Sequence, residues 1–600
     1  MNRKIPIALL LLLLSHSTWA LLPQDIAGGA SSLLGQDIMG GAAVVFRRPP
    51  RIRAATAGLI LKRRAAPQLP ANVEPVTNAD KAEAFNTQGN TYYDVGQFVQ
   101  AVEAYKKALS FKPNDPLTYN NLGAAEFSLG HNLEAAAAFQ QAIKARPDAE
   151  AYFNLGIAYS ALEKYNEAVE ALTQALRLKA DWPEAQNALG DAYLSAGRYE
   201  DAVTAYQATV RLQPDNIGAF NNLAFAYDKL SRYTDSIEAL KKAIQIKPDD
   251  VFAYNNLGAA SYKAGKYQDA VDAFQQALKL KPGDAEIQNN LGAAQYALAN
   301  YPAAVEAFSE AIKARPDFAD AQYNLGNAYL MSGKFTEAGA SYQQAIRSRP
   351  DYAEAQNNLG IALTNLGRFA DAVAAFKSAA RLKPDLAIVF NNLAFAEDKL
   401  GHEPEAIAAY KEAIRLNSKY PKALNGLGYV YDKTGRFAEA IELLKQAVEQ
   451  KPDYLVAHYN LGKAFFDAGR FAEAAESFKR ATQLKPDYEE AWLNLGAASF
   501  RAGQFNEAAQ AFNQAVGINP SNTQAYYSLG NASYKAGKYQ DALAAFKETV
   551  RQKPTFAQAH YSLGLVYASL NDKEGVTRQF AILKKLDPQL AEQFYRAVKK

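Results

Sequence analysis

The sequence contains no cysteine, which excludes disulfide bonds and a lipid anchor attached to an N-terminal cysteine. Histidine is scarce as well. The four that follow residue 20 are His131, His402, His458 and His560, and none has a partner at metal-ligand spacing. We find neither a glycine-rich phosphate loop nor a nucleophile elbow. The sequence therefore predicts a protein that is not an enzyme, with no catalytic residues, no metal site and no cofactor.

An excess of charge of one sign is also lacking. The formal net charge of the 600 residues is +3, of which residues 1–20 carry +2 and residues 21–80 carry +3, so the remainder carries −2. This near balance does not favour nucleic acid as a partner. After residue 20, no stretch approaches the roughly 18 consecutive apolar residues of a membrane-spanning helix.

What the sequence does contain is a repeat with a period of 34 residues. A small residue, which we number position 8 of each repeat, recurs fifteen times, and every step is 34 residues except one of 33 between Gly123 and Gly156. Such a period is typical of stacked helix–turn–helix arrays, in which each repeat contacts mainly its neighbours. The small residues are Gly89, Gly123, Gly156, Gly190, Ala224, Gly258, Gly292, Gly326, Gly360, Ala394, Gly428, Gly462, Gly496, Gly530 and Gly564.

Other positions of the repeat are nearly as constant. Position 7 is leucine in fourteen copies, position 20 is alanine in thirteen, and position 24 is tyrosine, phenylalanine or leucine in all fifteen. Position 32 is proline in thirteen copies, and in the other two Pro183 or Pro421 follows three residues later, where the first turn of a helix tolerates it. The aspartates that follow proline, such as Asp351 and Asp453, are expected to cap the next helix.

This pattern resembles the tetratricopeptide repeat family over residues 82 to about 590. The resemblance implies an all-α fold, a right-handed α-solenoid, or superhelix, of about fifteen helix–turn–helix repeats over residues 82–590. Residues 589–600 predict a C-terminal capping helix, because Leu590, Phe594 and Val598 form one apolar stripe.

One polar feature recurs inside the first helix of the repeat. Asparagine is a mediocre helix former, yet position 6 is asparagine in ten repeats. In the tetratricopeptide family the first helices line the concave wall and position 6 faces the groove. The row resembles that in the tetratricopeptide half of O-linked N-acetylglucosamine transferases, which implies that it grips the backbone of an extended peptide and does not imply the transfer reaction. The predicted partner-binding residues are Asn121, Asn154, Asn222, Asn256, Asn290, Asn324, Asn358, Asn392, Asn460 and Asn494.

Two alternative origins of this asparagine row stay open. Residues 221–230 (NNLAFAYDKL) nearly equal residues 391–400 (NNLAFAEDKL), so duplication alone could have copied the asparagines. Alternatively, each asparagine could bond the helix of the next repeat.

The N-terminal 81 residues do not repeat. Residues 1–20 predict a secretory signal peptide, since Arg3 and Lys4 precede a short apolar run and Thr18-Trp19-Ala20 is a suitable cleavage site; a membrane anchor is the alternative. Residues 21–81 are rich in Gly, Ala, Pro and Arg and predict a flexible linker or an attachment segment. The attachment alternatives are a strand or plug that adds to a neighbour, or contact with an anionic surface through Arg47, Arg48, Arg51, Arg53, Lys62, Arg63 and Arg64.

We therefore predict an exported protein, periplasmic, cell-surface or extracellular, that acts as an interaction scaffold and binds extended peptides or other proteins in a concave groove. One alternative is a structural subunit of an extracellular homopolymer or filament in which residues 21–80 link the subunits, so that the partner is a second copy. Another is an accessory factor in envelope or polysaccharide assembly.

Overall fold

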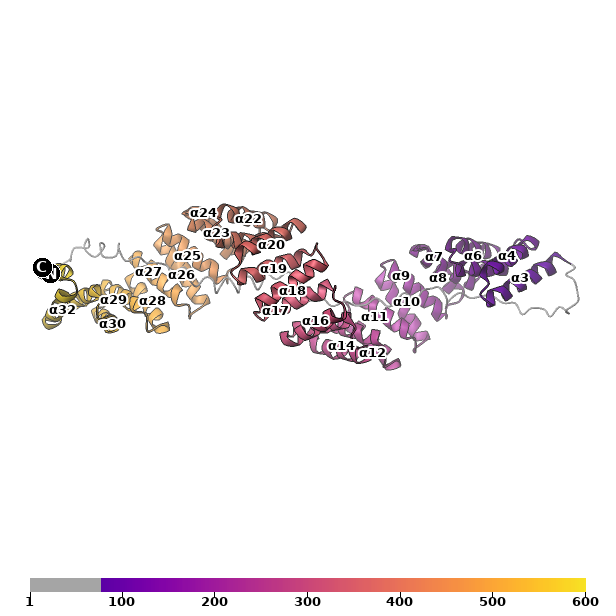
Figure 1. Ribbon diagram of the computed structural model, residues 1–600, viewed down its shortest axis with the longest axis horizontal. Coiled ribbons are helices and arrows are strands. Elements are labelled where there is room, and N and C mark those ends of the chain that lie inside the picture. Colours follow the sequence, from indigo (N-terminus) through magenta and orange to yellow (C-terminus); the bar gives the residue numbers. More distant parts are fainter. Residues whose placement is uncertain (1–76, 600) are drawn as a thin grey trace. The chain divides into compact units, whose positions relative to one another are not determined.

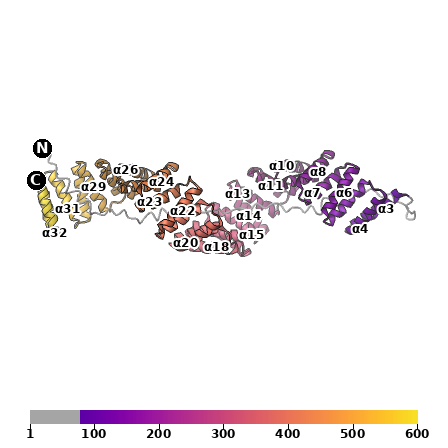
Figure 2. The same ribbon diagram turned by 90° about the horizontal axis from the view of Figure 1, so that it is seen from above.

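The structure, a computed structural model, describes residues 77–599. These residues form 31 helices and no strand, which confirms the predicted all-α solenoid. The predicted signal peptide and linker lie outside the described residues. The described chain divides between residues 333 and 334 into two compact units, which we call the N-terminal unit (residues 77–333) and the C-terminal unit (residues 334–599). Figures 1 and 2 show successive helices that run back and forth within each unit.

The N-terminal unit alternates first helices, mostly of 13 residues, with second helices of 14 residues. Its first helices are α3 (Asn78–Asp94), α5 (Pro116–Ser128), α7 (Ala149–Ala161), α9 (Pro183–Ser195), α11 (Ile217–Lys229), α13 (Val251–Lys263), α15 (Ala285–Ala297) and α17 (Ala319–Met331). Its second helices are α4 (Phe98–Phe111), α6 (Asn132–Ala145), α8 (Tyr165–Leu178), α10 (Tyr199–Leu212), α12 (Tyr233–Ile246), α14 (Tyr267–Leu280) and α16 (Tyr301–Ala314).

The C-terminal unit continues the same alternation and starts with a second helix. Its second helices are α18 (Phe335–Ser348), α20 (Phe369–Leu382), α22 (Glu403–Leu416), α24 (Phe437–Gln450), α26 (Phe471–Leu484), α28 (Phe505–Ile518), α30 (Tyr539–Gln552) and α32 (Lys573–Leu586). Its first helices are α19 (Ala353–Asn365), α21 (Ala387–Lys399), α23 (Pro421–Lys433), α25 (Leu455–Asp467), α27 (Glu489–Arg501), α29 (Thr523–Lys535) and α31 (Ala557–Ser569), and α33 (Pro588–Lys599) follows them.

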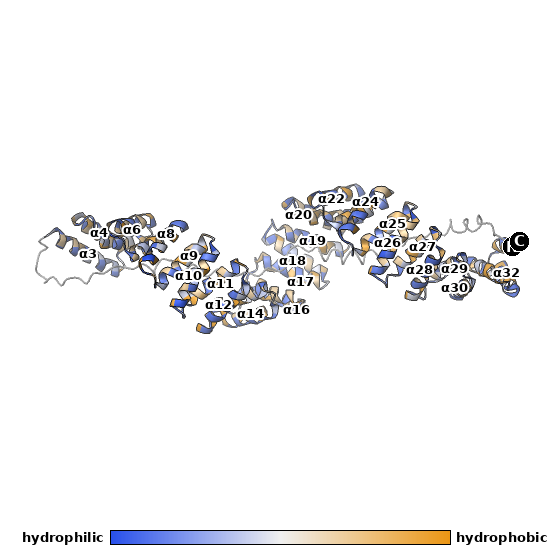
Figure 3. Ribbon diagram, turned by 180° about the vertical axis from the view of Figure 1, so that it is seen from behind, coloured by the Kyte–Doolittle hydropathy of each residue, from blue (hydrophilic) through white to orange (hydrophobic). Residues whose placement is uncertain are grey.

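The two helices of a repeat approach closely at the position-8 glycine. The ring of Phe274, at position 24, lies so near Gly258 that a Cβ atom added to this glycine would come within 2.5 Å of the ring. Phe274 is fully buried, as are the equivalent rings of other repeats. Only glycine accommodates the ring at this distance, because protein interiors are close-packed. Figure 3 shows apolar and polar residues mixed on each helix, as expected when one stripe of a helix is buried.

Repeat ten departs from this packing. Its position 8 is Ala394, whose methyl group occupies the space where the ring of Tyr410 would otherwise lie. The Tyr410 ring instead lies against Gly426 of the next repeat, 2.4 Å from where a Cβ of that glycine would be. Gly426 stands at position 6, where most repeats carry asparagine. The displaced ring leaves no room for a Cβ atom at position 6 of repeat eleven, which accounts for the gap in the asparagine row there.

The helix ends follow the sequence in part. Pro183 and Pro421 begin α9 and α23 at the first turn, as predicted. The prediction that Asp351 and Asp453 cap the next helices is wrong, because the N-cap residue stands one position later and is a tyrosine without a side-chain bond in both cases. Where that later position is Asp or Asn, its side chain does accept a backbone N–H, at Asp115, Asn216, Asp250, Asp284 and Asn522.

The last helix closes the C-terminal unit. Leu590, Ala591 and Phe594 of α33 are buried. The ring of Phe594 lies on Gly564, 2.5 Å from where its Cβ would be, and so takes the place that a position-24 ring takes in other repeats. Among residues 77–599, no helix is both long and apolar enough to cross a membrane.

Candidate functional site

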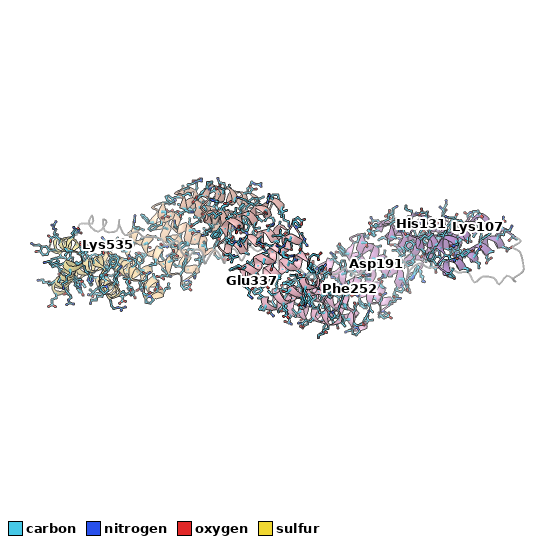
Figure 4. All side chains as sticks on the ribbon, viewed as in Figure 1. Lys107, His131, Asp191, Phe252, Glu337 and Lys535 are labelled. Atoms are coloured by element: carbon cyan, nitrogen blue, oxygen red, sulfur yellow. The ribbon has the colours of Figure 1, made fainter. Side chains whose placement is uncertain are left out.

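The position-6 asparagines of the N-terminal unit lie between neighbouring first helices. Asn154 donates its side-chain N–H to Oδ1 of Asn120 over 3.0 Å, and Asn290 donates to Oδ1 of Asn255 over 3.1 Å. Asn324 donates in the same way to Asn289 over 2.9 Å. In the remaining bonds of this kind the acceptor is at position 9 of the preceding repeat: Asn121 donates to Asn90, and Asn222 to Asp191, which Figure 4 labels on α9.

The C-terminal unit repeats this arrangement. Asn392 donates to Oδ1 of Asn357 over 3.1 Å, and Asn460 donates to Oδ1 of Asn425 over 2.9 Å. In the last member the acceptor is a hydroxyl group, because Asn494 donates to Oη of Tyr459 over 2.9 Å. Asn256 and Asn358 accept from the asparagine that precedes them in their own helices, Asn255 over 3.4 Å and Asn357 over 3.0 Å.

These bonds define an amide row that holds the first helices of each unit in register. Nine of its ten members are buried, with at most 8% of their surface exposed, and Asn494 is half-buried. The geometry fits the alternative in which the asparagines bond the neighbouring repeat. Contact between these ten residues and a partner stays a prediction.

Beside the amide row, one set of interacting side chains, part exposed and part buried, occurs in both units. On α11, Phe225 lies under the exposed Lys229, whose Nζ is 5.2 Å from the ring centre. Asp228, almost fully buried, pairs with Lys263 of α13 over 2.8 Å. Five repeats later, Phe395 and Lys399 of α21 and the pair Asp398–Lys433, 3.2 Å apart, repeat this set. We call these the first-helix clusters: Phe225, Asp228, Lys229 and Lys263 in one unit, and Phe395, Asp398, Lys399 and Lys433 in the other.

The C-terminal cluster continues into the next repeat. Lys433 also pairs with Glu403 over 3.2 Å, and Lys463 of α25 bridges Asp432 and Asp467 over 2.5 Å and 2.6 Å. Burial raises the pKa of Asp432, although Lys463 acts in the opposite direction. For Lys463 itself, burial acts to lower the pKa, but the bonds to the two carboxylates outweigh it and the pKa is raised. The ion pairs of α21, α23 and α25 therefore fix lysines and carboxylates next to one another along these three first helices.

A second duplicated constellation, which the repeat pattern did not predict, lies on the side of the second helices. Glu397 is buried and takes bonds from Nδ1 of His402 and Nζ of Lys377, both over 2.8 Å. Glu126 takes the same bonds from His131 and Lys106, over 2.8 Å and 3.1 Å.

The sequence signal for this constellation is a coupled change at positions 11 and 16, where these two repeats carry glutamate (Glu126, Glu397) and histidine (His131, His402). In four other repeats these positions hold an aromatic ring and an arginine that stacks on it: Tyr193 and Arg198, Tyr227 and Arg232, Tyr431 and Arg436, and Phe465 and Arg470.

Comparison with known protein families identifies the repeat. A family model described as the cilia and flagella-associated protein 70 C-terminal domain matches residues 54–289 and again residues 283–491. Models described as tetratricopeptide repeats match residues 465–532 and 530–571. The chain belongs to the tetratricopeptide repeat family. Members of this family are typically non-catalytic scaffolds. A comparison with curated proteins finds no significant match.

Solved structures with similar folds include three that differ in how much of this chain they cover. The APC/C hetero-tetramer Cut9–Hcn1 is 15% identical, with a TM-score of 0.32, over 81% of this chain and 96% of that chain. MamA is 28% identical, with a TM-score of 0.26, over 27% of this chain and 95% of its own. YrrB, described as a tetratricopeptide protein with an unusual peptide-binding site, is 24% identical, with a TM-score of 0.27, over 31% of this chain and 96% of its own.

Proposed function

We propose that this tetratricopeptide protein is a non-enzymatic scaffold that binds extended peptide segments of other proteins along its first helices. The observation that supports this best is the first-helix cluster, which recurs in both units. Each cluster combines an exposed lysine, fixed over an aromatic ring, with a lysine of the next first helix that a buried aspartate holds in place. Charges at the rim of an interface steer association and fix its register.

The amide row contributes to this function by fixing the spacing of the first helices. Because eight of the ten amides bond the preceding repeat, the clusters are held in place before a partner arrives. A preformed surface loses less conformational entropy on binding than a mobile one, and this favours affinity.

The experiment that tests the proposal is selection of peptides from a random display library, followed by affinity measurement. In the cluster variant, Lys229→Glu and Lys399→Glu reverse the exposed cation of each cluster. In the control variant, Lys242→Glu and Lys419→Glu make the same change of charge at exposed positions outside the first helices. We expect the wild type and the control to enrich the same peptides, and the cluster variant to bind them at least about tenfold more weakly.

Circular dichroism checks that all three proteins are equally helical. If the cluster variant binds the selected peptides as tightly as the control does, the proposed surface is wrong. A further variant, Asn290→Ala with Asn392→Ala, separates the amide row from the clusters. An effect on peptide affinity without any loss of stability would assign the asparagines a direct contact.

We also propose that the protein is exported. The support is the sequence of residues 1–20, with two basic residues, a short apolar run and Thr18-Trp19-Ala20. The mature chain is then expected to begin at or within a few residues of Leu21. Intact-mass measurement of the native protein tests this, and a mass that includes Met1 would contradict it.

A further inference from the structure

The two units carry opposite net charges. The N-terminal unit, residues 77–333, has 22 lysines and arginines against 31 aspartates and glutamates, a net charge of −9. Residues 334–600 have 34 lysines and arginines against 28 aspartates and glutamates, a net charge of +6. The near balance of the repeats as a whole is therefore the sum of an acidic and a basic half.

The difference is most regular on the second helices, at positions 22 and 25. In the N-terminal unit, position 22 carries an exposed acid in five of seven repeats, and we call this the acidic row: Glu103, Glu170, Glu238, Asp272 and Glu306. In the C-terminal unit, position 25 carries an exposed lysine in five repeats, and we call this the lysine row: Lys377, Lys411, Lys445, Lys479 and Lys547.

Most members of each row lack an opposite charge at the neighbouring position; the exceptions are Lys106 and Lys241 beside the acidic row and Glu442 and Glu476 beside the lysine row. Where the lysine row runs, position 22 is often alanine, as at Ala374, Ala408 and Ala544. Where the acidic row runs, position 25 is mostly uncharged, as at Gln207 and Gln275. Positions 22 and 25 are neighbours on one face of a helix. The two rows therefore occupy the same face of the repeat, with opposite sign.

The lysines of this row are available to a partner. Lys377 pairs with Glu397, but within residues 334–599 the other four lysines form no ion pair. Lys445 lies over the ring of Phe465, with Nζ 5.7 Å from the ring centre, and Lys547 lies 6.0 Å from that of Tyr567. These aromatic residues belong to the following repeat, so the lysines extend over the groove between successive second helices.

The same groove is hollow in both units. In the N-terminal unit an open depression of about 320 Å³ lies among α12, α13 and α14, and its charged lining consists of Asp269 and Asp272 together with Lys241 and Lys266. In the C-terminal unit a depression of about 280 Å³ at the equivalent positions lies among α18, α19 and α20, lined by Leu359 and Leu363. Each unit therefore has a shallow depression between two successive second helices, and the one in the N-terminal unit borders the acidic row.

We propose that the lysine row of one chain docks on the acidic row of a second copy of the same chain. The opposite net charges of the units identify the occupant, since each chain carries both halves of the contact. Within the rows, Glu238, Asp272 and Glu306 follow one another at a spacing of a single repeat, as Lys377, Lys411, Lys445 and Lys479 do, so these consecutive charges can pair without loss of register. Complementary charge patterns of this kind steer association and fix its register. The contact uses second helices and leaves the first-helix clusters free, so it does not depend on the proposed peptide binding.

The test is sedimentation velocity of the purified full-length chain over a range of concentrations and salt. The lysine-row variant is Lys411→Glu, Lys445→Glu and Lys479→Glu; the acidic-row variant is Glu170→Lys, Glu238→Lys and Glu306→Lys. A control for the first variant, Lys419→Glu, Lys538→Glu and Lys573→Glu, makes an equal change of charge at exposed positions outside the lysine row. A chain that carries both row reversals and an equimolar mixture of the two row variants complete the set.

We expect the wild type and the control to self-associate at low salt and to dissociate at about 1 M salt, where the Debye length falls to about 3 Å. Each row variant is expected to associate at least about tenfold more weakly, whereas the chain with both reversals, and the mixture of the two variants, regain association. A wild type that stays monomeric at every concentration and salt overturns the proposal. So does a loss of association in the lysine-row variant alone, because the lysines would then contact an acidic surface of the second copy other than the acidic row.

Discussion

The two units of this chain differ in the charge of their surfaces but share the packing and the hydrogen bonds of their cores. In both, a position-24 side chain packs on a position-8 glycine and an amide row joins the first helices. In both, a first-helix cluster and a Lys–Glu–His constellation occur once. The net charge, by contrast, changes from −9 to +6. The period of 34 residues thus constrains the buried positions, whereas the exposed positions of the second helices have diverged between the units.

The largest expected effect tests the part that the units share. Gly292→Leu in the N-terminal unit and Gly496→Leu in the C-terminal unit would each drive a side chain into a ring that lies 2.6 Å or 2.7 Å from the added Cβ atom. Overpacking of this kind costs about 1–3 kcal/mol of unfolding free energy, and occasionally more. Denaturant titration of both variants should show losses of similar size. A large loss in one unit only would mean that the two cores are not equivalent.

The second prediction concerns the repeat that breaks the shared packing. Gly426→Asn would restore the amide row but places a Cβ atom 2.4 Å from the Tyr410 ring, so we expect a loss of about 1–3 kcal/mol. Ala394→Gly should let the ring move to the position that it has in other repeats. The double variant is therefore expected to lose less stability than Gly426→Asn alone. A double-mutant cycle measures this coupling, and strict additivity would mean that the displaced ring does not cause the gap in the row.

The third prediction compares the amide rows of the two units. Asn290→Ala and Asn392→Ala each remove one buried hydrogen bond of 3.1 Å. The acceptor oxygen on the preceding first helix, of Asn255 or Asn357, then loses its donor. The net worth of such a bond is about 0.5–1.5 kcal/mol. Equal losses in thermal unfolding experiments would support a stacking role throughout. Unchanged stability in both variants would contradict it.

Much of this architecture could be predicted from the sequence, because the period and the small residues determine which helix faces pack together. The hydrogen-bond partners of the position-6 asparagines could not be predicted in this way. Position 6 lies at the edge between the exposed and the buried faces of the first helix, and only the distance between successive first helices decides whether an amide such as Asn290 reaches Asn255 or a ligand. The lysine and acidic rows were hidden for another reason. A net charge summed over all repeats cancels them, and they emerge only when the two units are counted separately.

The smallest expected effect lies in the pH dependence of the C-terminal unit. Burial acts to raise the pKa of Glu397, but the bonds from Lys377 and His402 outweigh it, and the pKa is lowered from its ordinary value of 4.5. A carboxyl group with a lowered pKa binds protons less tightly in the folded chain than in the unfolded chain. The contribution of Glu397 to the free energy of unfolding is therefore complete above about pH 4.5 and is lost as the pH falls through the lowered pKa.

Asp432, in the same unit, has the opposite sign. Its pKa is raised by burial, so its contribution is present below the ordinary aspartate value of 3.8 and is lost as the pH rises through the raised value. Glu397→Gln should therefore flatten the loss of stability on acidification, whereas Asp432→Asn should steepen it. Thermal melts from pH 7 to pH 3 compare these slopes with that of the wild type. If both variants shift the slope in the same direction, the charges around Glu397 do not act as the geometry indicates.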